Sequence, residues 1–399
     1  MISFLGYDIP KLKGLGGDLT AKEILQQPDL WLETYQLIVR QRDEISAFME
    51  KINKEKGIRI IFTGAGSSAF VGDAVTPYLS RKMGCNVESI ATTDLVTNPD
   101  NYLFSDIPTL LISCARSGNS PESVATVQLA EKIVKNLYQL VITCNPNGEL
   151  AKQTRGNQKA LLVLMPEDSN DKGFAMTGSF TTMVLSSLLI FSEPKLEEYK
   201  SLVEKIAAHG KKMMKTNSIN EAIKDLAQSN FNRGIYLGSS CLKGLAQEAS
   251  LKMLELTAGS VNTDSNSALG FRHGPKSVVN EETVVVFCIS SDAYTRQYEL
   301  DLLKEMASEN KAQKLICFTP IDDEEVRSLA DLTIFIGEGI EKEIDDVILL
   351  FPNVLIAQML AFQKAITLGI TPDNPCPSGT VNRVVKGVVI YPFNLRPVS

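Results

Sequence analysis

The 399-residue chain contains no segment rich in lysine and arginine, which excludes one common class of partner. It carries 40 basic and 47 acidic residues, for a formal net charge of −7, and no basic run with interleaved aromatic residues. Because such runs are the electrostatic signature of nucleic-acid binding, nucleic acid is not expected as a partner. Backbone amides can still bind an anion locally, whatever the overall charge.

The chain also lacks cysteine pairs, a leader and long uninterrupted apolar runs. Its seven cysteines form no CxxC pair, which favours buried reduced thiols over a disulfide or zinc framework. No basic-then-apolar leader follows Met1. The apolar stretch 181–191 is too short to span a bilayer, and polar residues and a proline interrupt 347–362, so both are expected to be buried helices. We therefore expect a cytoplasmic protein that does not partner with membranes.

The alternation of β-rich runs with helical patterns predicts the fold class. Such runs occur five times in each half of the chain, at 58–63, 86–91, 109–113, 139–143 and 160–165, then at 234–237, 260–263, 283–289, 314–318 and 332–336. This order predicts an α/β fold with two tandem doubly wound parallel sheets. In such sheets ligands bind beyond the carboxyl ends of the strands.

Changes of pattern along the chain set the expected domain boundaries. Helical spacing and a capping-box pattern at Thr20 and Glu23 predict an N-terminal helical extension over 1–54. The first domain is expected over 55–215, the second over 216–370, and an irregular, proline-rich tail over 371–399. A polar helical stretch, 194–220, joins the halves, and its His209 is expected at the surface.

Two segments of the first half recur in the second half. The triplet Gly-Ser-Ser ends an apolar run at 66–68 and again at 238–240, which aligns Gly66 with Gly238. A second pair of segments, 109–117 and 283–291, follows the two triplets at nearly the same interval. The recurrence indicates a duplicated fold, and each turn lies where an α/β sheet would hold a phosphate.

Glycine and serine after a strand favour anion binding, because the backbone can approach the ligand and the first amides of the following helix are unpaired. Either turn of the first half could by itself be a tight turn with a serine cap. Two turns together favour a phosphomonoester site made by Gly66, Ser67, Ser68, Arg116, Ser117 and Ser120. In the second half Asp292 stands where Gly118 does, and its carboxylate would repel phosphate, so the phosphate is expected on the first half.

Candidate catalytic residues lie in the second half. Glu248, Lys252 and Glu255 are spaced to share one face of a helix predicted to begin after Gly244. A solvated salt-bridge face is the ordinary interpretation of this spacing. The position of the helix directly after a ligand-side turn favours catalysis instead. His273 stands in an Arg-His-Gly-Pro loop, a better setting for catalysis than a core.

The two turns at 64–68 and 113–122 resemble the phosphate loops of the sugar isomerase (SIS) family, and the resemblance covers nearly the whole chain as a tandem pair of domains. Each domain is then expected to have a flavodoxin-like three-layer architecture. Segments 20–28 and 270–275 resemble one subgroup, the tagatose-6-phosphate ketose/aldose isomerases, also called galactosamine-6-phosphate deaminase/isomerases.

The resemblance implies a role for each candidate residue. It implies that Glu255 moves a proton between C2 and C1 of the sugar, with Glu248 and Lys252 as ring-opening or supporting groups. It implies that His273 opens the ring, often from the neighbouring subunit, and that Lys386 in the tail covers the sugar; an exposed lysine is the alternative for Lys386.

The implied reaction converts D-galactosamine 6-phosphate to D-tagatose 6-phosphate and ammonia, with neither metal nor organic cofactor. Isomerisation without deamination and a non-catalytic sugar-phosphate sensor are the alternatives. Shared active sites imply a homodimer or a dimer of dimers.

Overall fold

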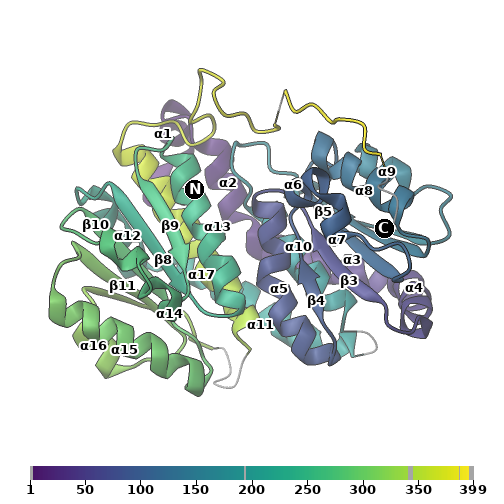
Figure 1. Cartoon of the computed structure of the whole chain (residues 1–399). Coiled ribbons are helices and arrows are strands. Elements are labelled where there is room, and N and C mark those ends of the chain that lie inside the picture. Colours follow the sequence, from purple (N-terminus) through teal and green to yellow (C-terminus); the bar gives the residue numbers. More distant parts are fainter. Residues whose placement is uncertain (1–2, 193–194, 340–344, 386, 395–399) are drawn as a thin grey trace. The chain divides into compact units, whose positions relative to one another are not determined.

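The computed structural model describes residues 3–192, 195–339, 345–385 and 387–394 (Figure 1). The chain folds into two compact units, each named here after its central strand. The β5 unit comprises Glu33–Asn170, Gly178–Lys200 and Val381–Ser399, and the β10 unit comprises Met1–Leu32, Asp171–Thr177 and Ser201–Thr380. Both units are discontinuous in sequence, and the expected boundaries at residues 54, 215 and 370 stay a prediction.

The β5 unit contains a five-stranded parallel sheet in the order β4-β3-β5-β6-β7. Its strands are β3 (Arg59–Thr63), β4 (Val87–Ser89), β5 (Thr109–Ala115), β6 (Leu137–Thr143) and β7 (Ala160–Leu164). All five coincide with the β-rich runs of the first half. The central strands β5 and β6 are buried along their whole length, as expected for a parallel sheet with both faces covered.

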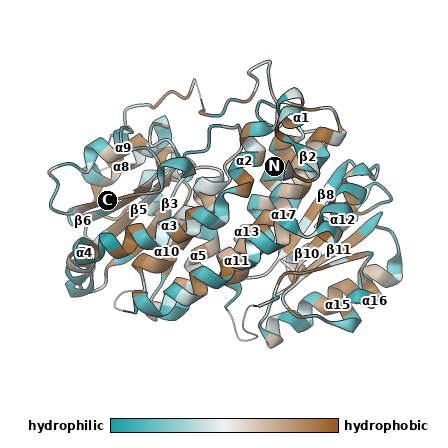
Figure 2. Cartoon of the chain, turned by 180° about the vertical axis from the view of Figure 1, so that it is seen from behind, coloured by the Kyte–Doolittle hydropathy of each residue, from teal (hydrophilic) through white to brown (hydrophobic). Residues whose placement is uncertain are grey.

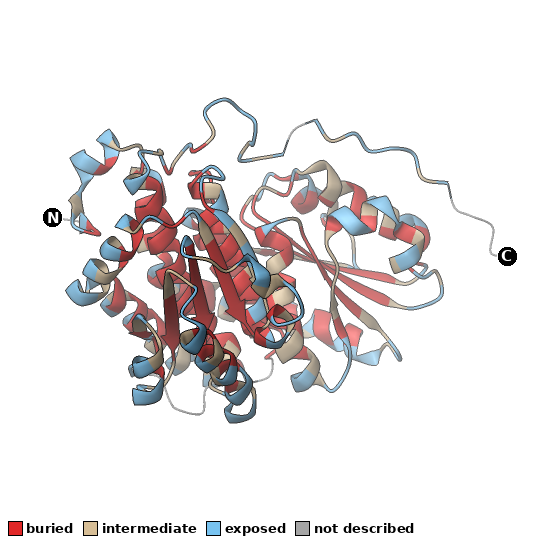
Figure 3. Cartoon of the chain, turned by 60° about the vertical axis from the view of Figure 1, so that its left-hand side comes forward, coloured by how far each residue is buried: buried red, intermediate tan, exposed pale blue. Residues whose placement is uncertain are grey.

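Helices connect and cover these strands. They are α4 (Arg42–Lys54), α5 (Ser67–Met83), α6 (Thr92–Thr97), α7 (Pro99–Tyr102), α8 (Pro121–Ile133), α9 (Glu149–Gln153) and α10 (Gly178–Ile190), with the 3-10 turns η1 (Glu167–Ser169) and η2 (Leu196–Glu198). Every residue of α10 is buried, which confirms the expected buried helix at 181–191. Figure 3 shows the same contrast, with buried strands and outer helices that expose one face.

The β10 unit contains the second five-stranded parallel sheet, in the order β12-β11-β10-β8-β9. Its strands are β8 (Arg233–Gly238), β9 (Asn262–Asn266), β10 (Thr283–Cys288), β11 (Lys314–Thr319) and β12 (Leu332–Phe335), and a hairpin of β1 (Ser3–Phe4) and β2 (Tyr7–Asp8) lies near the N-terminus. The predicted pair of tandem parallel sheets is thus confirmed.

The helices of this unit are α1 (Ile9–Gly14), α2 (Asp18–Leu25), α11 (Tyr199–Lys215), α12 (Asn217–Gln228), α13 (Cys241–Leu256), α14 (Ala268–Phe271), α15 (Ala293–Glu309), α16 (Glu324–Leu329) and α17 (Asp346–Thr367), with the 3-10 turn η3 (Pro275–Val278). The β10 unit takes in the first residues of α3 (Gln27–Arg40), and the β5 unit takes in the rest of α3 and the first two residues of α11. Figure 2 shows that the strands of both sheets are mostly hydrophobic.

Helix α17 is the core helix of the β10 unit. Among the described residues it is the one helix long and apolar enough to cross a membrane, yet 94% of its most apolar window is buried inside the protein. Two of its polar side chains form hydrogen bonds inside the β10 unit. Asn353 Nδ2 donates to the Leu349 carbonyl at 2.7 Å, and Gln358 Oε1 accepts from Gln27 Nε2 at 2.6 Å. The expected buried helix at 347–362 is therefore confirmed.

The capping-box prediction at Thr20 and Glu23 is wrong. Helix α2 begins at Asp18 with Gly17 as its N-cap, so Thr20 lies inside the helix. The Thr20 hydroxyl donates instead to Asp373 at 2.7 Å, and Glu23 accepts the backbone N–H groups of Lys172 and Gly173. Both side chains thus serve tertiary contacts within the β10 unit rather than a helix cap.

Candidate active site

The first predicted phosphate turn joins β3 to α5 in a conformation that favours glycine. Gly66 is the N-cap of α5 with φ 56° and ψ −130°, a backbone region that side chains disfavour. A Cβ atom on Gly64 would lie 2.5 Å from the Ser68 backbone. Ser67 and Ser68 form the first turn of α5 and are buried. The turn therefore presents helix N-terminal amides and serine hydroxyls at the carboxyl end of β3.

The second predicted turn follows β5, which pairs directly with β3 in the sheet. It places Arg116, 7% exposed, at the carboxyl end of β5, followed by Ser117 and by Ser120 at the N-cap of α8. Ser117 Oγ accepts the Asn119 N–H at 3.3 Å, and the Ser120 hydroxyl lies 2.7 Å from that of Ser123. Because parallel neighbours end at the same edge of the sheet, the structure brings the two turns together.

Arg116 also contacts the C-terminal tail within the β5 unit. Its Nη2 donates to the backbone carbonyl of Arg383 at 2.7 Å. Further along, Lys132 donates to the carbonyl of Phe393, and its ammonium lies 5.9 Å from the centre of that ring. Lys386, the predicted tail lysine, lies outside the described residues.

The structural alignment of the two halves differs by two residues from the alignment of their Gly-Ser-Ser triplets. A Cβ on Gly238 would lie 2.2 Å from the Leu242 carbonyl oxygen, as one on Gly64 would collide with Ser68. Ser240 is the N-cap of α13 with φ 53° and ψ −123°, close to the angles of Gly66. The structural repeat thus aligns Gly64 with Gly238 and Gly66 with Ser240, and the same offset aligns the first residues of β5 and β10.

This register gives the first turn of α13 fewer hydroxyl donors than the first turn of α5. Cys241 and Leu242 occupy the places of Ser67 and Ser68, the first helical residues of α5. A leucine side chain cannot donate a hydrogen bond, and a thiol is a weak donor. The start of α13 therefore offers an anion fewer side-chain donors than the start of α5.

The turn after β10 is bonded to the chain's own carboxylates. Asp346, at the start of α17, accepts from the backbone N–H and the hydroxyl of Ser291, both at 2.7 Å, and from the hydroxyl of Ser290 at 2.5 Å. Glu299 accepts the Ser290 N–H at 2.8 Å, and burial raises the pKa of Glu299 to about 7. Asp292, expected to repel phosphate, caps α15 instead by accepting the Thr295 N–H.

Glu248, Lys252 and Glu255 of α13 form a largely buried cluster. The helix begins at Cys241, not after Gly244 as predicted, because the repeated turn ends earlier. The side chains of Glu248 and Lys252 are 0% exposed, and that of Glu255 is 25% exposed. Lys252 Nζ lies 3.4 Å from Glu248 Oε1 and 2.5 Å from Glu255 Oε2. This burial rules out the solvated salt-bridge face and leaves one carboxylate, Glu255, accessible.

His273 lies in an exposed turn of the same unit. It follows α14 and precedes η3, and its backbone N–H donates to the Gly270 carbonyl at 3.0 Å. The β10 unit thus carries Glu248, Lys252, Glu255 and His273, and the β5 unit carries the residues predicted to bind phosphate.

His209, the other histidine, is not at the surface as expected. It is 6% exposed on α11, one face of which packs into the β10 unit, and this burial lowers its pKa. Sequence reasoning also missed Asp346 and Glu299. An acidic pair, Asp345 and Asp346, directly before a long apolar run was the available signal for the first of these.

Comparisons with known proteins agree with this architecture. The chain matches the SIS domain twice, over residues 51–192 and 226–368. It is 42% identical over 389 residues to the D-galactosamine-6-phosphate deaminase AgaS of Shewanella sp. (strain ANA-3), covering 96% of this chain and 94% of that protein.

Two solved structures share the fold along almost the whole chain. The tagatose-6-phosphate ketose/aldose isomerase of Escherichia coli is 38% identical, with a TM-score of 0.84, covering 95% of this chain and 98% of that one. A protein from Clostridium novyi NT, provisionally assigned the same activity, is 49% identical, with a TM-score of 0.95 and coverage of 98% and 100%. The resemblance to the SIS family is confirmed, and the chain belongs to the SIS domain family.

Proposed function

We propose that this protein is a sugar-phosphate deaminase/isomerase that converts D-galactosamine 6-phosphate to D-tagatose 6-phosphate and ammonia. The observation that carries the proposal is the α13 cluster, in which buried Lys252 holds the accessible carboxylate of Glu255 at 2.5 Å. Such a carboxylate, fixed in orientation, is suited to proton transfer. The relative from Shewanella, 42% identical, carries the deaminase name.

The 6-phosphate is bound by the turns of the β5 unit. The backbone amides of Gly66 and Ser67, the hydroxyls of Ser68, Ser117 and Ser120, and the guanidinium of Arg116 supply the donors. A helix N-terminus favours a negative ligand, and arginine forms strong charge-assisted bonds to phosphate. The second half does not compete for the phosphate. In its turn after β10, the backbone N–H groups of Ser290 and Ser291 already donate to Glu299 and Asp346.

The reaction is a proton transfer followed by hydrolysis. His273 transfers the proton that opens the sugar ring to the 2-amino aldehyde. Glu255 then removes the C2 proton as the aldehyde oxygen is protonated, giving an enolamine, and returns the proton to C1. The resulting ketimine at C2 adds water and loses ammonia, which leaves the ketose. Glu248 and Lys252 support Glu255.

Isomerisation without deamination is the second candidate. The Escherichia coli structure, 38% identical, carries the name tagatose-6-phosphate ketose/aldose isomerase. The same carboxylate would move a proton between C2 and C1 of a neutral sugar, with a hydroxyl in place of the amine and no ammonia released.

Ammonia release from galactosamine 6-phosphate, with glucosamine 6-phosphate in parallel and the ketose phosphate followed, tests the proposal. Release from the galacto substrate with an equal amount of ketose supports the deaminase. Glu255→Gln should abolish turnover and retain sugar-phosphate binding by calorimetry, whereas Glu281→Gln, on an exposed loop, should match the wild type. Ketose formation from a neutral aldose phosphate without ammonia release would replace the deaminase by the isomerase.

We also infer a homodimer, or a dimer of dimers, working in the cytoplasm. The support for a shared site is the exposed position of His273, which leaves its imidazole accessible to a second chain. The support for a reducing compartment is that all seven cysteines are free. Light scattering after size exclusion measures the assembly, and a monomer that is fully active would contradict the shared site.

A further inference from the structure

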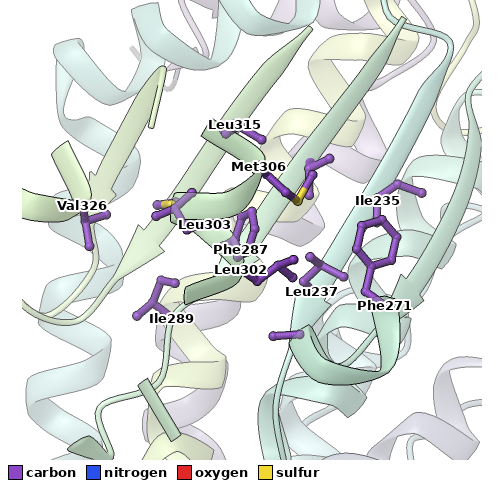
Figure 4. Close-up of a cluster of buried hydrophobic side chains, with 13 residues drawn as sticks. Ile235, Leu237, Phe271, Phe287, Ile289, Leu302, Leu303, Met306, Leu315 and Val326 are labelled. Carbon is purple, nitrogen blue, oxygen red and sulfur yellow. The ribbon is translucent and has the colours of Figure 1, made fainter. Parts of the chain in front are cut away.

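The turn that carries His273 is held in place on both sides. Before it, Phe271 is fully buried in a hydrophobic cluster with Leu302, Leu303 and Met306 of α15 (Figure 4). After it, Gly274 has a φ of 120°, a conformation open to glycine alone at little cost. Phe271 therefore fixes the start of the turn against α15, while the backbone beyond His273 needs another restraint.

That restraint comes from one carboxylate on α15. Glu305 pairs with Arg272 at 2.8 Å, directly before His273, and with Lys276, three residues after it. Lys276 also pairs with Glu309 at 2.6 Å, one helical turn along. The Lys276 hydrogen bond lowers the pKa of Glu305, so the carboxylate is ionised near neutral pH. Glu305 thus bridges the two cations that flank the histidine.

The charge pattern makes this bridge more than an ordinary surface ion pair. An isolated exposed pair contributes little to stability, because solvent screens it and ordering the side chains costs entropy. Here the Lys276 side chain is only 18% exposed, and two cations share one acceptor. Without Glu305, Arg272 loses its ion pair to α15, and Lys276 keeps only its pair with Glu309. The residue directly before His273 is then no longer held on α15 by an ion pair.

We propose that Glu305 is a positioning residue that holds the His273 turn on α15 through Arg272 and Lys276. The proposal rests on the proposed function, in which the His273 imidazole opens the sugar ring. Glu305 does not touch the sugar; it acts by keeping the imidazole in the orientation that ring opening needs. Such alignment matters, since a displacement of about 1 Å can lower a rate about 100-fold.

Glu305→Gln tests the proposal, because it removes the charge and keeps the size of the side chain. We expect kcat on the cyclic substrate to fall between about 10-fold and 100-fold. KM should stay within about twofold, since the phosphate site is untouched. Glu305→Asp should recover part of the loss. Glu325→Gln is the matched control. It breaks a partly exposed ion pair between Glu325 of α16 and Lys304 of α15, at 2.9 Å, away from the His273 turn.

A second measurement reads the turn without any substrate. His209 and His273 are the only histidines of the chain, so a protein labelled with carbon-13 at histidine Cε1 gives two resonances per chain. Glu305→Gln should shift and broaden the His273 signal and leave the His209 signal unchanged. Glu325→Gln should change neither signal.

The two measurements separate the possible failures. An unchanged His273 signal together with unchanged kcat in Glu305→Gln overturns the proposal. A changed signal with unchanged kcat overturns it as well, since His273 orientation would then not limit the reaction. If the wild type turns over no sugar phosphate, the proposed function fails and takes the catalytic role of Glu305 with it, whereas the signal still decides whether Glu305 orders the turn. A changed signal with reduced kcat and preserved KM supports the proposal.

Discussion

Gly66 and Ser240 occupy the same place in the two halves and have nearly the same backbone angles, with φ of 56° and 53°. Each is the N-cap of the helix that follows the first strand of its repeat in sequence. Only in the first half is the residue a glycine, so the second half retains the turn at a conformational cost.

Ser240→Gly should therefore stabilise the protein. A side chain at positive φ costs about 1 kcal/mol or more, which glycine avoids. We expect the free energy of unfolding to rise by about 1 kcal/mol in urea titrations. Ser308→Gly in helix α15 is the control and should lower it by about 0.5 kcal/mol. A loss of stability in Ser240→Gly would show that the serine makes a compensating contact.

Ser117 and Ser291 occupy corresponding places in the two halves and form a matched pair for testing the phosphate site. Ser117→Ala should raise KM for the sugar phosphate about tenfold, because a hydroxyl bonded to a charged phosphate is lost. Ser291→Ala should leave KM unchanged, because that hydroxyl donates to Asp346. Initial-rate kinetics and competition by inorganic phosphate measure both. Equal effects of the two substitutions would mean that the phosphate is not bound by the first half alone.

Lys252 should be essential for stability as well as for catalysis. Lys252→Met leaves the fully buried Glu248 carboxylate without the ammonium at 3.4 Å. Removing one partner of a buried pair costs about 3–5 kcal/mol, because the other charge stays desolvated. Urea unfolding monitored by circular dichroism measures this loss. Lys304→Met, which breaks an exposed pair, should cost less than about 1 kcal/mol, and a similar loss in both variants would contradict the prediction.

Glu299 should make stability depend on pH. Its pKa of about 7 in the folded protein exceeds the ordinary 4.5, so the folded state binds more protons between these values. The contribution of Glu299 to stability is therefore complete below pH 4.5 and decreases as the pH rises through 7, by at most about 3 kcal/mol. Glu299→Gln keeps an oxygen for the Ser290 N–H and loses the titration.

The difference in the free energy of unfolding between wild type and Glu299→Gln tests this dependence. The free energy of unfolding of the wild type, relative to that of the variant, should decrease as the pH rises from about 5 to about 8. Other buried acids, such as Glu23, titrate in both proteins and cancel in the comparison. A difference that is constant over this range would show that Glu299 is ionised throughout.

The sequence by itself determined the ten strands of the two parallel sheets, their order along the chain and the family. Period and composition are local properties, so runs such as 109–113 and 283–289 predicted strands within one or two residues of β5 and β10. The glycines of the first phosphate turn could also be identified from the sequence, because glycine adopts a positive φ at the least cost. Spacing alone also placed Glu248, Lys252 and Glu255 on one face, but it could not state whether that face is buried.

Only the tertiary structure decided which residues are buried and which distant groups meet. The Gly-Ser-Ser match aligned Gly66 with Gly238, and the backbone angles show that its counterpart is Ser240 instead. His209 is buried because α11 packs by one face into the β10 unit, which its polar sequence concealed. Asp346 meets Ser291 on a different element, and Glu305 meets Arg272 in the same way. Contacts of this kind depend on how the helices pack on the sheet, and no local pattern carries that information.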